Sequence, residues 1–350
     1  MAPVIDRELL RRLPKAELHC HLDGSVRAET LIELGEAYGV AMPRSGPAAL
    51  RDYMLVADAR NLEDYLARFS VTVAVMQTAE AIERIAYELA EDAACEGVRY
   101  LEVRFAPVLN LRQGLSPGDA IDASLRGLAR GEREFGTVGR VIVCALRTMP
   151  ADVSLEFAEL AVAYRGRGVV GFDLAGGEAG NQANVHSRAF AHALDHDLAC
   201  TCHAGEADGP ESIRQAVHVC GANRIGHATR LIDDEALLEY VNDRRIPLEI
   251  CLTSNVQTRA AASYADHPAR AFFDRGLNVV LNTDNRLMSG VTLTDEYALA
   301  ASELGFDFDE LCQIARNGFE SAFLPSEERG VLVDTMTVEI EALRHQRKSA

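Results

Sequence analysis

The sequence predicts a single α/β domain spanning residues 1–350, built as a (β/α)8 barrel of the TIM type with a helical insertion after the first strand. Short apolar runs alternate with amphipathic stretches, and eight such units occupy about 280 residues without a Pro/Gly/Ser-rich linker. This alternation implies parallel strands joined by crossover helices. An open dinucleotide-binding sheet is disfavoured, because its first strand is normally followed by a Gly-rich phosphate loop, which is missing after His21.

The expected strands are short, apolar and bounded by polar or turn residues. In chain order they are residues 16–20, 99–105, 140–146, 169–174, 199–203, 224–227, 247–252 and 278–282. Between them, apolar residues recur three and four positions apart, as Ile121, Leu125 and Leu128 do within residues 119–135. A similar stripe predicts a helix over 154–164. After Asp284, expected helices over 295–304 and 308–322 close and cap the barrel.

The segment between the first two strands is too long for one crossover helix. Residues 31–38, 62–74 and 79–94 within it have helical patterns. We therefore predict that residues 28–96 form a helical lid over the mouth of the barrel.

Composition disfavours several function classes. The net charge of -18, from 35 Lys+Arg and 53 Asp+Glu, argues against nonspecific binding of nucleic acid or an anionic membrane. The N-terminus lacks a secretory signal pattern, and no apolar stretch approaches the roughly 18 residues that span a bilayer. Several of the eight cysteines lie in apolar strand-like runs, as expected for reduced thiols. We expect a cytoplasmic protein with a small-molecule partner.

Polar residues cluster where four of the expected strands end. They are His19-Cys20-His21, His203-Ala-Gly-Glu206, Gly226-His227 and Asn282-Thr-Asp284-Asn285. Side chains two apart on a strand share a face, so both imidazoles of the first cluster can face the barrel axis. The carboxyl ends of the strands carry the active sites of this fold. The four clusters are therefore expected to converge.

Each cluster alone has a plainer explanation. A His-x-His pair is weak evidence, a strand histidine is often structural, and Asp284-Asn285 could form a turn. Their joint occurrence favours a metal site. Three imidazoles and one carboxylate, from His19, His21, His203 and Asp284, suit zinc with an open position for water, although iron or manganese accept the same donors. Zinc lowers the pKa of a bound water to about 7.

Lysine content limits the number of metal ions. Many related barrel hydrolases hold two metals bridged by a carboxylated lysine from the fourth strand. This chain contains only Lys15 and Lys348, and neither lies near residues 169–176. A lysine-bridged pair is therefore excluded, and we expect one Zn²⁺ per chain.

Two further titratable residues lie beside the expected ligands. Glu206 follows His203 by three residues and could shuttle a proton to a ring nitrogen of the substrate. His227 could orient or deprotonate the attacking water and stabilise developing charge. The alternatives are a solvated loop glutamate and a structural histidine.

These motifs resemble those of the adenosine deaminase family in the amidohydrolase superfamily, over almost the whole chain. The resemblance depends on Lys15-Ala-Glu-Leu-His-Cys-His-Leu-Asp-Gly24, Gly171-Phe-Asp-Leu-Ala-Gly176, His203-Ala-Gly-Glu206, Arg224-Ile-Gly-His-Ala-Thr229, Ser254-Asn255 and Asn282-Thr-Asp-Asn285. Several motifs in the correct order and spacing make it highly specific.

The resemblance implies a role for each matched residue. His19, His21, His203 and Asp284 match the zinc ligands, Glu206 the proton donor to purine N1, and His227 the residue that orients the water. For substrate binding it implies Gly176 at purine N3, Asp23 at the ribose and Asn285 at N7, and His21 is also expected to contact the substrate. Aspartate instead of glutamate at position 23 is more typical of nucleoside deaminases than of adenine deaminases.

Two positions depart from the family pattern. Many members have a second aspartate where this chain has Asn285, whose amide can still donate a hydrogen bond to N7. Gly177-Glu178 replaces a frequent Asp-Glu pair, which leaves a small residue beside the purine contact and reshapes the pocket.

Three functional hypotheses remain. The first is a deaminase of adenosine or 2′-deoxyadenosine in purine salvage, and the second a deaminase of 6-aminodeoxyfutalosine in menaquinone biosynthesis. Length and motifs do not separate these two. The third, a non-catalytic metal-binding scaffold, predicts loss of Glu206, His227 or Asp284, and none is lost. A one-zinc esterase or lactonase is disfavoured by Gly176 and the placement of Glu206.

Overall fold

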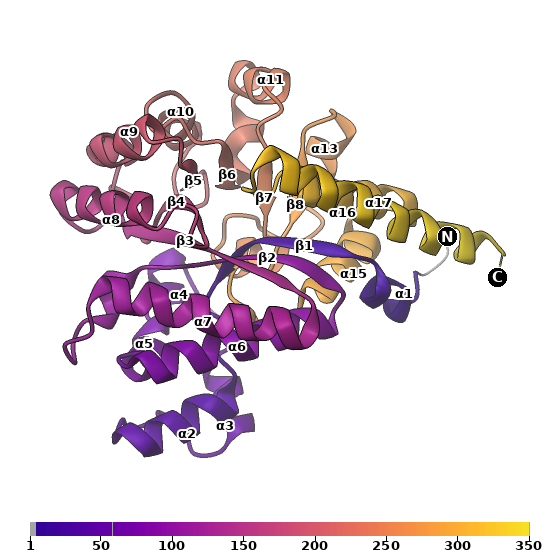
Figure 1. Ribbon diagram of the computed structural model, residues 1–350. Coiled ribbons are helices and arrows are strands. Elements are labelled where there is room, and N and C mark those ends of the chain that lie inside the picture. Colours follow the sequence, from indigo (N-terminus) through magenta and orange to yellow (C-terminus); the bar gives the residue numbers. More distant parts are fainter. Residues whose placement is uncertain (1–4, 58, 350) are drawn as a thin grey trace.

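A computed structural model describes residues 5–57 and 59–349 and contains eight parallel strands in the order β1 to β8 (Figure 1). The (β/α)8 prediction is confirmed, and each strand lies within two residues of its expected bounds. The strands are β1 Lys15–His21, β2 Val98–Phe105, β3 Val138–Leu146, β4 Val169–Ala175, β5 Ala199–Ala204, β6 Arg224–His227, β7 Leu248–Ile250 and β8 Val279–Leu281.

The barrel closes at the carboxyl ends of its strands. Neighbouring strands pair in chain order, but β8 reaches β1 only through an isolated bridge between Cys20 and Asp284. The Asp284 N–H donates to the His19 carbonyl at 2.9 Å, and the His21 N–H donates to the Asp284 carbonyl at 2.7 Å. Three of the four predicted metal ligands therefore take part in the hydrogen bonds that close the sheet.

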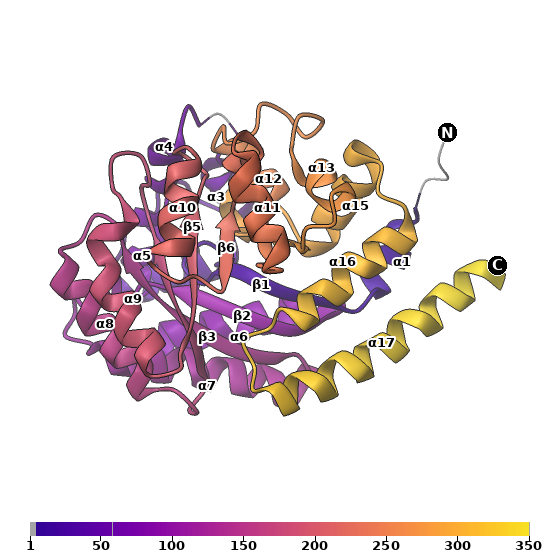
Figure 2. The same cartoon turned by 90° about the horizontal axis from the view of Figure 1, so that it is seen from above.

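Helices that follow the strands surround the barrel (Figures 1 and 2). Those in the outer part of the repeating units are α7 Pro117–Phe135, α8 Ala151–Ala163, α9 Ser187–Asp195, α10 Pro210–His218, α11 Glu235–Asp243, α13 Ala269–Asp274 and α16 Phe308–Glu320. The shorter or connecting helices are α1 Arg7–Arg12, η1 Pro107–Asn110, η2 Ala183–His186, η3 Thr229–Asp233, α12 Leu252–Gln257, α14 Arg286–Ser289 and α15 Leu293–Leu304.

The insertion after β1 contains five helices. They are α2 Ala28–Tyr38, α3 Pro47–Met54, α4 Leu62–Leu66, α5 Phe69–Val75 and α6 Ala79–Cys95. The helix expected over 62–74 is interrupted at residues 67–68, where the dihedrals remain helical. Helix α3, which begins with Pro47, was not predicted. Helix α6 packs along α7 and against β2, so it belongs to the outer ring, whereas α2 and α3 project from the body of the molecule (Figure 1).

Small residues let α6 and α7 approach closely. A Cβ added at Gly127 would lie 2.2 Å from the carbonyl oxygen of Glu83, and one at Gly131 would lie 2.4 Å from the Cβ of Ala90. Helix α7 begins with a capping box between Ser116 and Asp119, as its sequence favours. This pair of helices fixes where the insertion rejoins the barrel.

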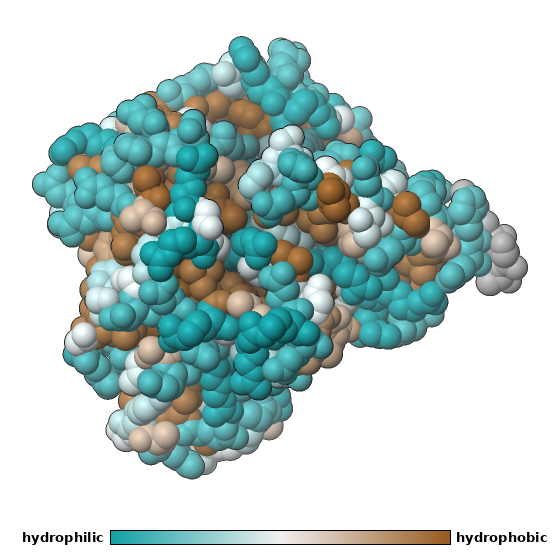
Figure 3. Space-filling view, viewed as in Figure 1, coloured by the Kyte–Doolittle hydropathy of each residue, from teal (hydrophilic) through white to brown (hydrophobic). Residues whose placement is uncertain are grey.

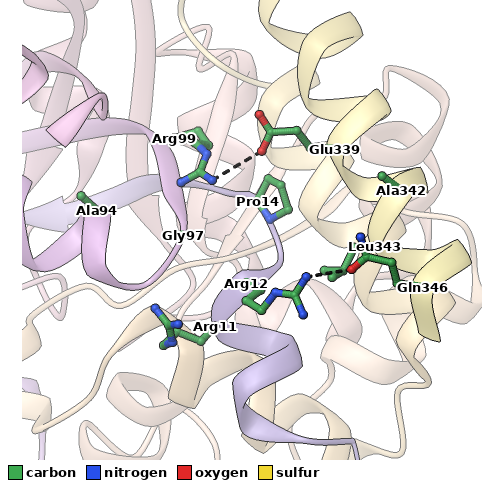
Figure 4. Close-up of a pocket in the computed structure, with 10 residues that line it drawn as sticks. All are labelled: Arg11, Arg12, Pro14, Ala94, Gly97, Arg99, Glu339, Ala342, Leu343 and Gln346. Atoms are coloured by element: carbon green, nitrogen blue, oxygen red, sulfur yellow. Dashed lines mark hydrogen bonds and ion pairs between the residues drawn. The ribbon is translucent and has the colours of Figure 1, made fainter. Parts of the chain in front are cut away.

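Helix α17, Ser326–Ser349, was not predicted and lies along the amino-terminal end of the barrel (Figure 2). Arg99 approaches Glu339 to 3.4 Å, and Arg12 donates to Gln346 at 2.8 Å, across a hollow of about 370 Å³ beside α17 (Figure 4). This hollow is at the opposite end of the strands from Asp284. Neither α17 nor any other helix within residues 5–57 and 59–349 is long and apolar enough to cross a membrane.

We predict that Gly127→Ala destabilises the protein. Alanine improves helix propensity by about 1 kcal/mol, but its methyl would overlap a backbone carbonyl, and such overpacking costs about 1–3 kcal/mol or more. The free energy of unfolding in urea should fall by about 1–2 kcal/mol. Gly330→Ala in α17 is the control, because no atom lies within 4 Å of its added Cβ. It should leave stability equal or slightly higher, and equal behaviour of both variants would contradict the packing argument.

Candidate active site

The four predicted metal ligands converge at the carboxyl end of the barrel. Ligand atoms of His19, His21, His203 and Asp284 all lie within 4.8 Å of one another. The Nε2 atoms of His21 and His203 are 3.1 Å apart, and Oδ1 of Asp284 is 3.4 Å from Nε2 of both His19 and His21. Ligands bound tetrahedrally at about 2.0–2.1 Å would be about 3.3 Å apart. The set therefore fits one ion of the size of zinc.

Carboxylates inside the barrel orient two of these imidazoles. Nδ1 of His19 lies 2.8 Å from Oε2 of Glu249, and Nδ1 of His203 lies 3.2 Å from Asp173. Each imidazole thus presents Nε2 to the cluster, as second-sphere carboxylates usually arrange for metal ligands. The buried Nε2 of His19 has no hydrogen-bond partner among the described residues. A metal ion would satisfy it.

Arg104 holds both carboxylates in place. Its guanidinium donates to Asp173 at 3.1 Å, to Glu249 at 2.9 Å and to the Leu18 carbonyl at 2.6 Å. Burial alone would raise the pKa of Glu249, but Arg104 and Arg224 hold it well below its ordinary value. None of these residues was predicted as part of the site. The sequence feature that could have indicated them is a charged residue within an otherwise apolar strand, before the carboxyl end of that strand.

Glu206 is buried beside the ligand cluster. Burial raises the pKa of its carboxyl well above the ordinary value, and the nearby charges of Asp284 and Glu178 act in the same direction. Its Oε1 has no hydrogen-bond partner among the described residues. The raised pKa favours the protonated form of Glu206, which has a proton to donate to a ligand in this position.

His227 is held by a chain of polar side chains. The Asn255 amide nitrogen donates to Nδ1 of His227 at 2.9 Å, and the Asn255 oxygen accepts from Nε2 of His267 at 3.1 Å. Burial keeps the pKa of His227 well below its ordinary value, so the ring is neutral and carries its proton on Nε2. Ser254 donates to Oδ2 of Asp284 at 2.6 Å. The Ser254-Asn255 motif was recognised in the sequence, but its orienting contacts were not.

Two of the site residues occupy strained backbone conformations. His227 and Asp284 have φ values of 64° and 61°, in the left-handed region that non-glycine residues rarely adopt. The residue before His227 is Gly226, and glycine is favoured there because a Cβ would lie 3.1 Å from Cε1 of His19 and from Cα of His203. The chain turns sharply at both strand ends, which directs these side chains toward the cluster.

A narrow cavity lies over the cluster. It is lined by His21, Leu62, Tyr65, Leu66, Phe69, Ala175, Gly176, His203, Glu206, His227, Asp284 and Asn285. Its free space of about 30 Å³ holds a few water molecules and is too small for a nucleoside. The apolar side of the cavity comes from α4 and α5.

Three of the four predicted substrate-binding residues line this cavity, namely His21, Gly176 and Asn285. Asp23 lies nearby and is buried without contributing to the lining, and burial raises its pKa to about 7. Oxygen atoms of Asp23 and Asn285 lack hydrogen-bond partners among the described residues. A Cβ at Gly24 would lie 1.9 Å from Oδ1 of Asn285, so only glycine allows this amide its position.

Glu178 fixes the loop that carries Glu206. Its carboxylate accepts hydrogen bonds from the backbone N–H groups of Gly205 at 2.6 Å and Glu206 at 2.9 Å, and from those of Ala207 and Asp208. The Ser212 hydroxyl also donates to it. The sequence analysis treated Glu178 only as part of a family motif, and no local pattern indicated which amides it would bind.

Comparisons with known proteins agree with this geometry. A family model described as adenosine deaminase matches residues 14–338. The chain belongs to the adenosine deaminase family. An adenosine deaminase of Mycobacterium avium is 41% identical over 354 residues, covering 95% of this chain and 97% of that protein. The family prediction is confirmed, and the protein is a hydrolase acting on C–N bonds of cyclic amidines.

Two solved structures of related enzymes are similar over nearly their whole length. An adenine deaminase from Arthrobacter aurescens has a TM-score of 0.87 at 28% identity, covering 94% of this chain and 99% of that one. A zinc-bound amidohydrolase from Burkholderia ambifaria has a TM-score of 0.89 at 25% identity, covering 100% and 98%. Adenosine-deaminase-type deamination is thus supported for this family member.

We predict that Glu178→Gln destabilises the Glu206 loop. An amide group accepts through one oxygen only, and its nitrogen would face backbone N–H donors, so buried donors would lose partners at about 1–3 kcal/mol each. The free energy of unfolding should fall by about 2–4 kcal/mol in chemical denaturation. Ser212→Ala removes a single donor and should cost about 1 kcal/mol. A loss in Glu178→Gln no larger than in Ser212→Ala would contradict the anchoring role.

Proposed function

We propose that the protein is a zinc-dependent deaminase that hydrolyses the 6-amino group of adenosine or a close derivative, giving the 6-oxopurine nucleoside and ammonia. The observation that carries this proposal is the buried Glu206, whose pKa is raised, beside a cluster of three histidines and one aspartate. A proton donor next to a metal-ligand set is what hydrolytic addition to an amidine carbon requires.

One zinc ion per chain would be held by His19, His21, His203 and Asp284. When bound, it would supply Lewis-acid activation of the attacking water. The chain's own residues prepare that site. Arg104 holds the two carboxylates that orient His19 and His203, and Ser254 orients Asp284.

The acid and base work falls to two residues. Glu206 would donate its proton to N1, which makes C6 more electrophilic as water adds there. The neutral His227 would direct Nε2–H toward the oxygen of that water and stabilise the negative charge that develops on it. One proton of the added water would pass through the Glu206 carboxylate to the amino group. The C6–N bond would then break, the amino group would leave as ammonia, and C6 would keep the oxygen while the hydroxyl proton returns to Glu206.

Substrate contacts would come from three sides of the cavity. The Gly176 backbone amide would reach N3, the Asn285 amide would reach N7, and His21 with Asp23 would lie on the ribose side. Because Leu62, Leu66 and Phe69 line a cavity that is too small for a nucleoside, we propose that α4 and α5 act as a lid that opens to admit the nucleoside.

Loss of the 6-aminopurine absorbance band, together with measured ammonia release, tests the reaction. Adenosine, 2′-deoxyadenosine, adenine and 6-aminodeoxyfutalosine should be compared by kcat/KM. We expect the highest value for adenosine or 2′-deoxyadenosine. Highest activity on 6-aminodeoxyfutalosine would move the assignment to menaquinone biosynthesis. Absence of ammonia from every 6-aminopurine tested would reject the proposed function.

Glu206→Gln should lower kcat at least 100-fold while the variant retains its metal, because it removes a proton donor and no ligand. The raised pKa also fixes the direction of the pH dependence. The acid form is present below that pKa and lost above it, so kcat/KM should fall as pH rises through it. Loss of metal from Glu206→Gln would contradict the role of Glu206. So would an unchanged fall of kcat/KM at high pH in this variant.

Metal analysis of the purified enzyme should give about one zinc per chain. His203→Ala should lose the metal, since it removes one of the four side chains that would coordinate the ion. His267→Gln is a matched control, because His267 lies two hydrogen bonds from the cavity and ligates nothing. Two zinc ions per chain, or full zinc content in His203→Ala, would overturn the assignment.

A further inference from the structure

Glu63 extends from the lid toward the wall of the cavity. It lies in α4 next to Leu62, whose side chain lines the cavity. One oxygen of its carboxylate is 3.7 Å from the position that a Cβ on Gly177 would occupy. Within the described part of the chain, Glu63 forms no ion pair, whereas its neighbour Asp64 is paired with Arg60 at 2.6 Å. Glu63 is thus a carboxylate without a basic partner at the edge of the site.

Gly177 leaves this edge of the cavity open. It directly follows Gly176, and it has no side chain between the cavity wall and Glu63. On the other side, Glu178 ties the same segment to the backbone of Glu206. The wall between Gly176 and Glu206 is therefore short, and the Glu63 carboxylate lies within 4 Å of the position of a Cβ on Gly177.

In the proposed binding mode, one position of the purine ring, C2, faces this wall. In the proposed binding mode Glu206 faces N1 and Gly176 faces N3. C2 is bonded to both of these nitrogens, so a substituent on C2 points between the two residues. It would then point across Gly177 toward the Glu63 carboxylate.

We infer that Glu63 recognises the C2 substituent of the substrate and favours 6-aminopurine nucleosides that carry an amino group at C2. This inference rests on the proposed function, because it uses the placement of N1 and N3 given there. A carboxylate accepts hydrogen bonds only, so it attracts an amino group and repels an electronegative atom such as fluorine. The charge of Glu63 also contributes to the raised pKa of Glu206, after burial and the charges of Asp284 and Glu178, as expected for a carboxylate near this wall.

The test compares kcat/KM for three nucleosides in the zinc-loaded enzyme. They are 2,6-diaminopurine riboside, adenosine and 2-fluoroadenosine. In Glu63→Ala, the ratio of 2,6-diaminopurine riboside to adenosine should fall about three- to tenfold, the effect of one hydrogen bond to a partly exposed charged group. The ratio of 2-fluoroadenosine to adenosine should rise. Because the C2 substituent also changes the basicity of N1, the Kd ratio described below separates recognition at C2 from the effect of the lost charge on Glu206.

Two further variants separate recognition from general disturbance of the lid. Asp64→Asn removes a negative charge from the same helix and should leave both ratios unchanged. Gly177→Ala keeps every charge and inserts a methyl group at ordinary contact distance from the Glu63 carboxylate. It should lower the 2,6-diaminopurine ratio in the same direction as Glu63→Ala.

A binding measurement keeps the inference testable without catalysis. The ratio of Kd values for 2-aminopurine riboside and purine riboside should shift in Glu63→Ala by a similar factor. If the wild type deaminates none of the nucleosides, the proposed function fails, and this Kd ratio still decides whether Glu63 senses C2. Unchanged ratios in Glu63→Ala, in turnover or in binding, or equal changes in Asp64→Asn, would overturn the inference.

Discussion

The guanidinium of Arg104 holds the two carboxylates that orient the imidazoles of His19 and His203. It binds Asp173 and Glu249 in the interior of the barrel, and these carboxylates in turn hold Nδ1 of His203 and His19. Without a cation, two buried carboxylates would take up protons and lose much of their strength as acceptors. Buried ion pairs of this kind add little net stability, because desolvation offsets their attraction. Their value here is orientation, since each fixes one imidazole so that Nε2 faces the site.

The same end of the barrel is where the first and last strands are joined. Strands β1 and β8 meet only through the bridge between Cys20 and Asp284, and Asp284 has a left-handed backbone. One residue thus closes the sheet through its backbone and offers an oxygen to the cluster through its side chain. A metal ion bound there would join β1, β5 and the end of β8, and would therefore stabilise the closed barrel as well as the site.

The sequence analysis predicted the strands and the ligands for one physical reason. Parallel strands are short apolar runs, and the fold places polar residues at their carboxyl ends, so His19, His203 and Asp284 could be found from pattern alone. Arg104, Glu249 and Glu178 could not, because their partners are distant in sequence and become neighbours only when the barrel closes. Helix α17 was missed because its polar residues obscure a narrow buried stripe that includes Met336 and Ile340. The 28–96 segment looked like one lid because the sequence does not reveal that α6 packs on α7.

The lid proposed for α4 and α5 would link the chemistry to closure of the site. Glu206 owes its raised pKa first to burial, and α4 and α5 form the apolar side of the cavity around it. If the lid opened, water would reach the carboxyl group, and its pKa would fall toward the ordinary value. The carboxyl group would then stay protonated to the highest pH when the lid is closed over a bound nucleoside. Closure would also bring the Glu63 carboxylate nearest to the purine. The same movement would then raise the pKa of Glu206 and allow Glu63 to contact the C2 substituent.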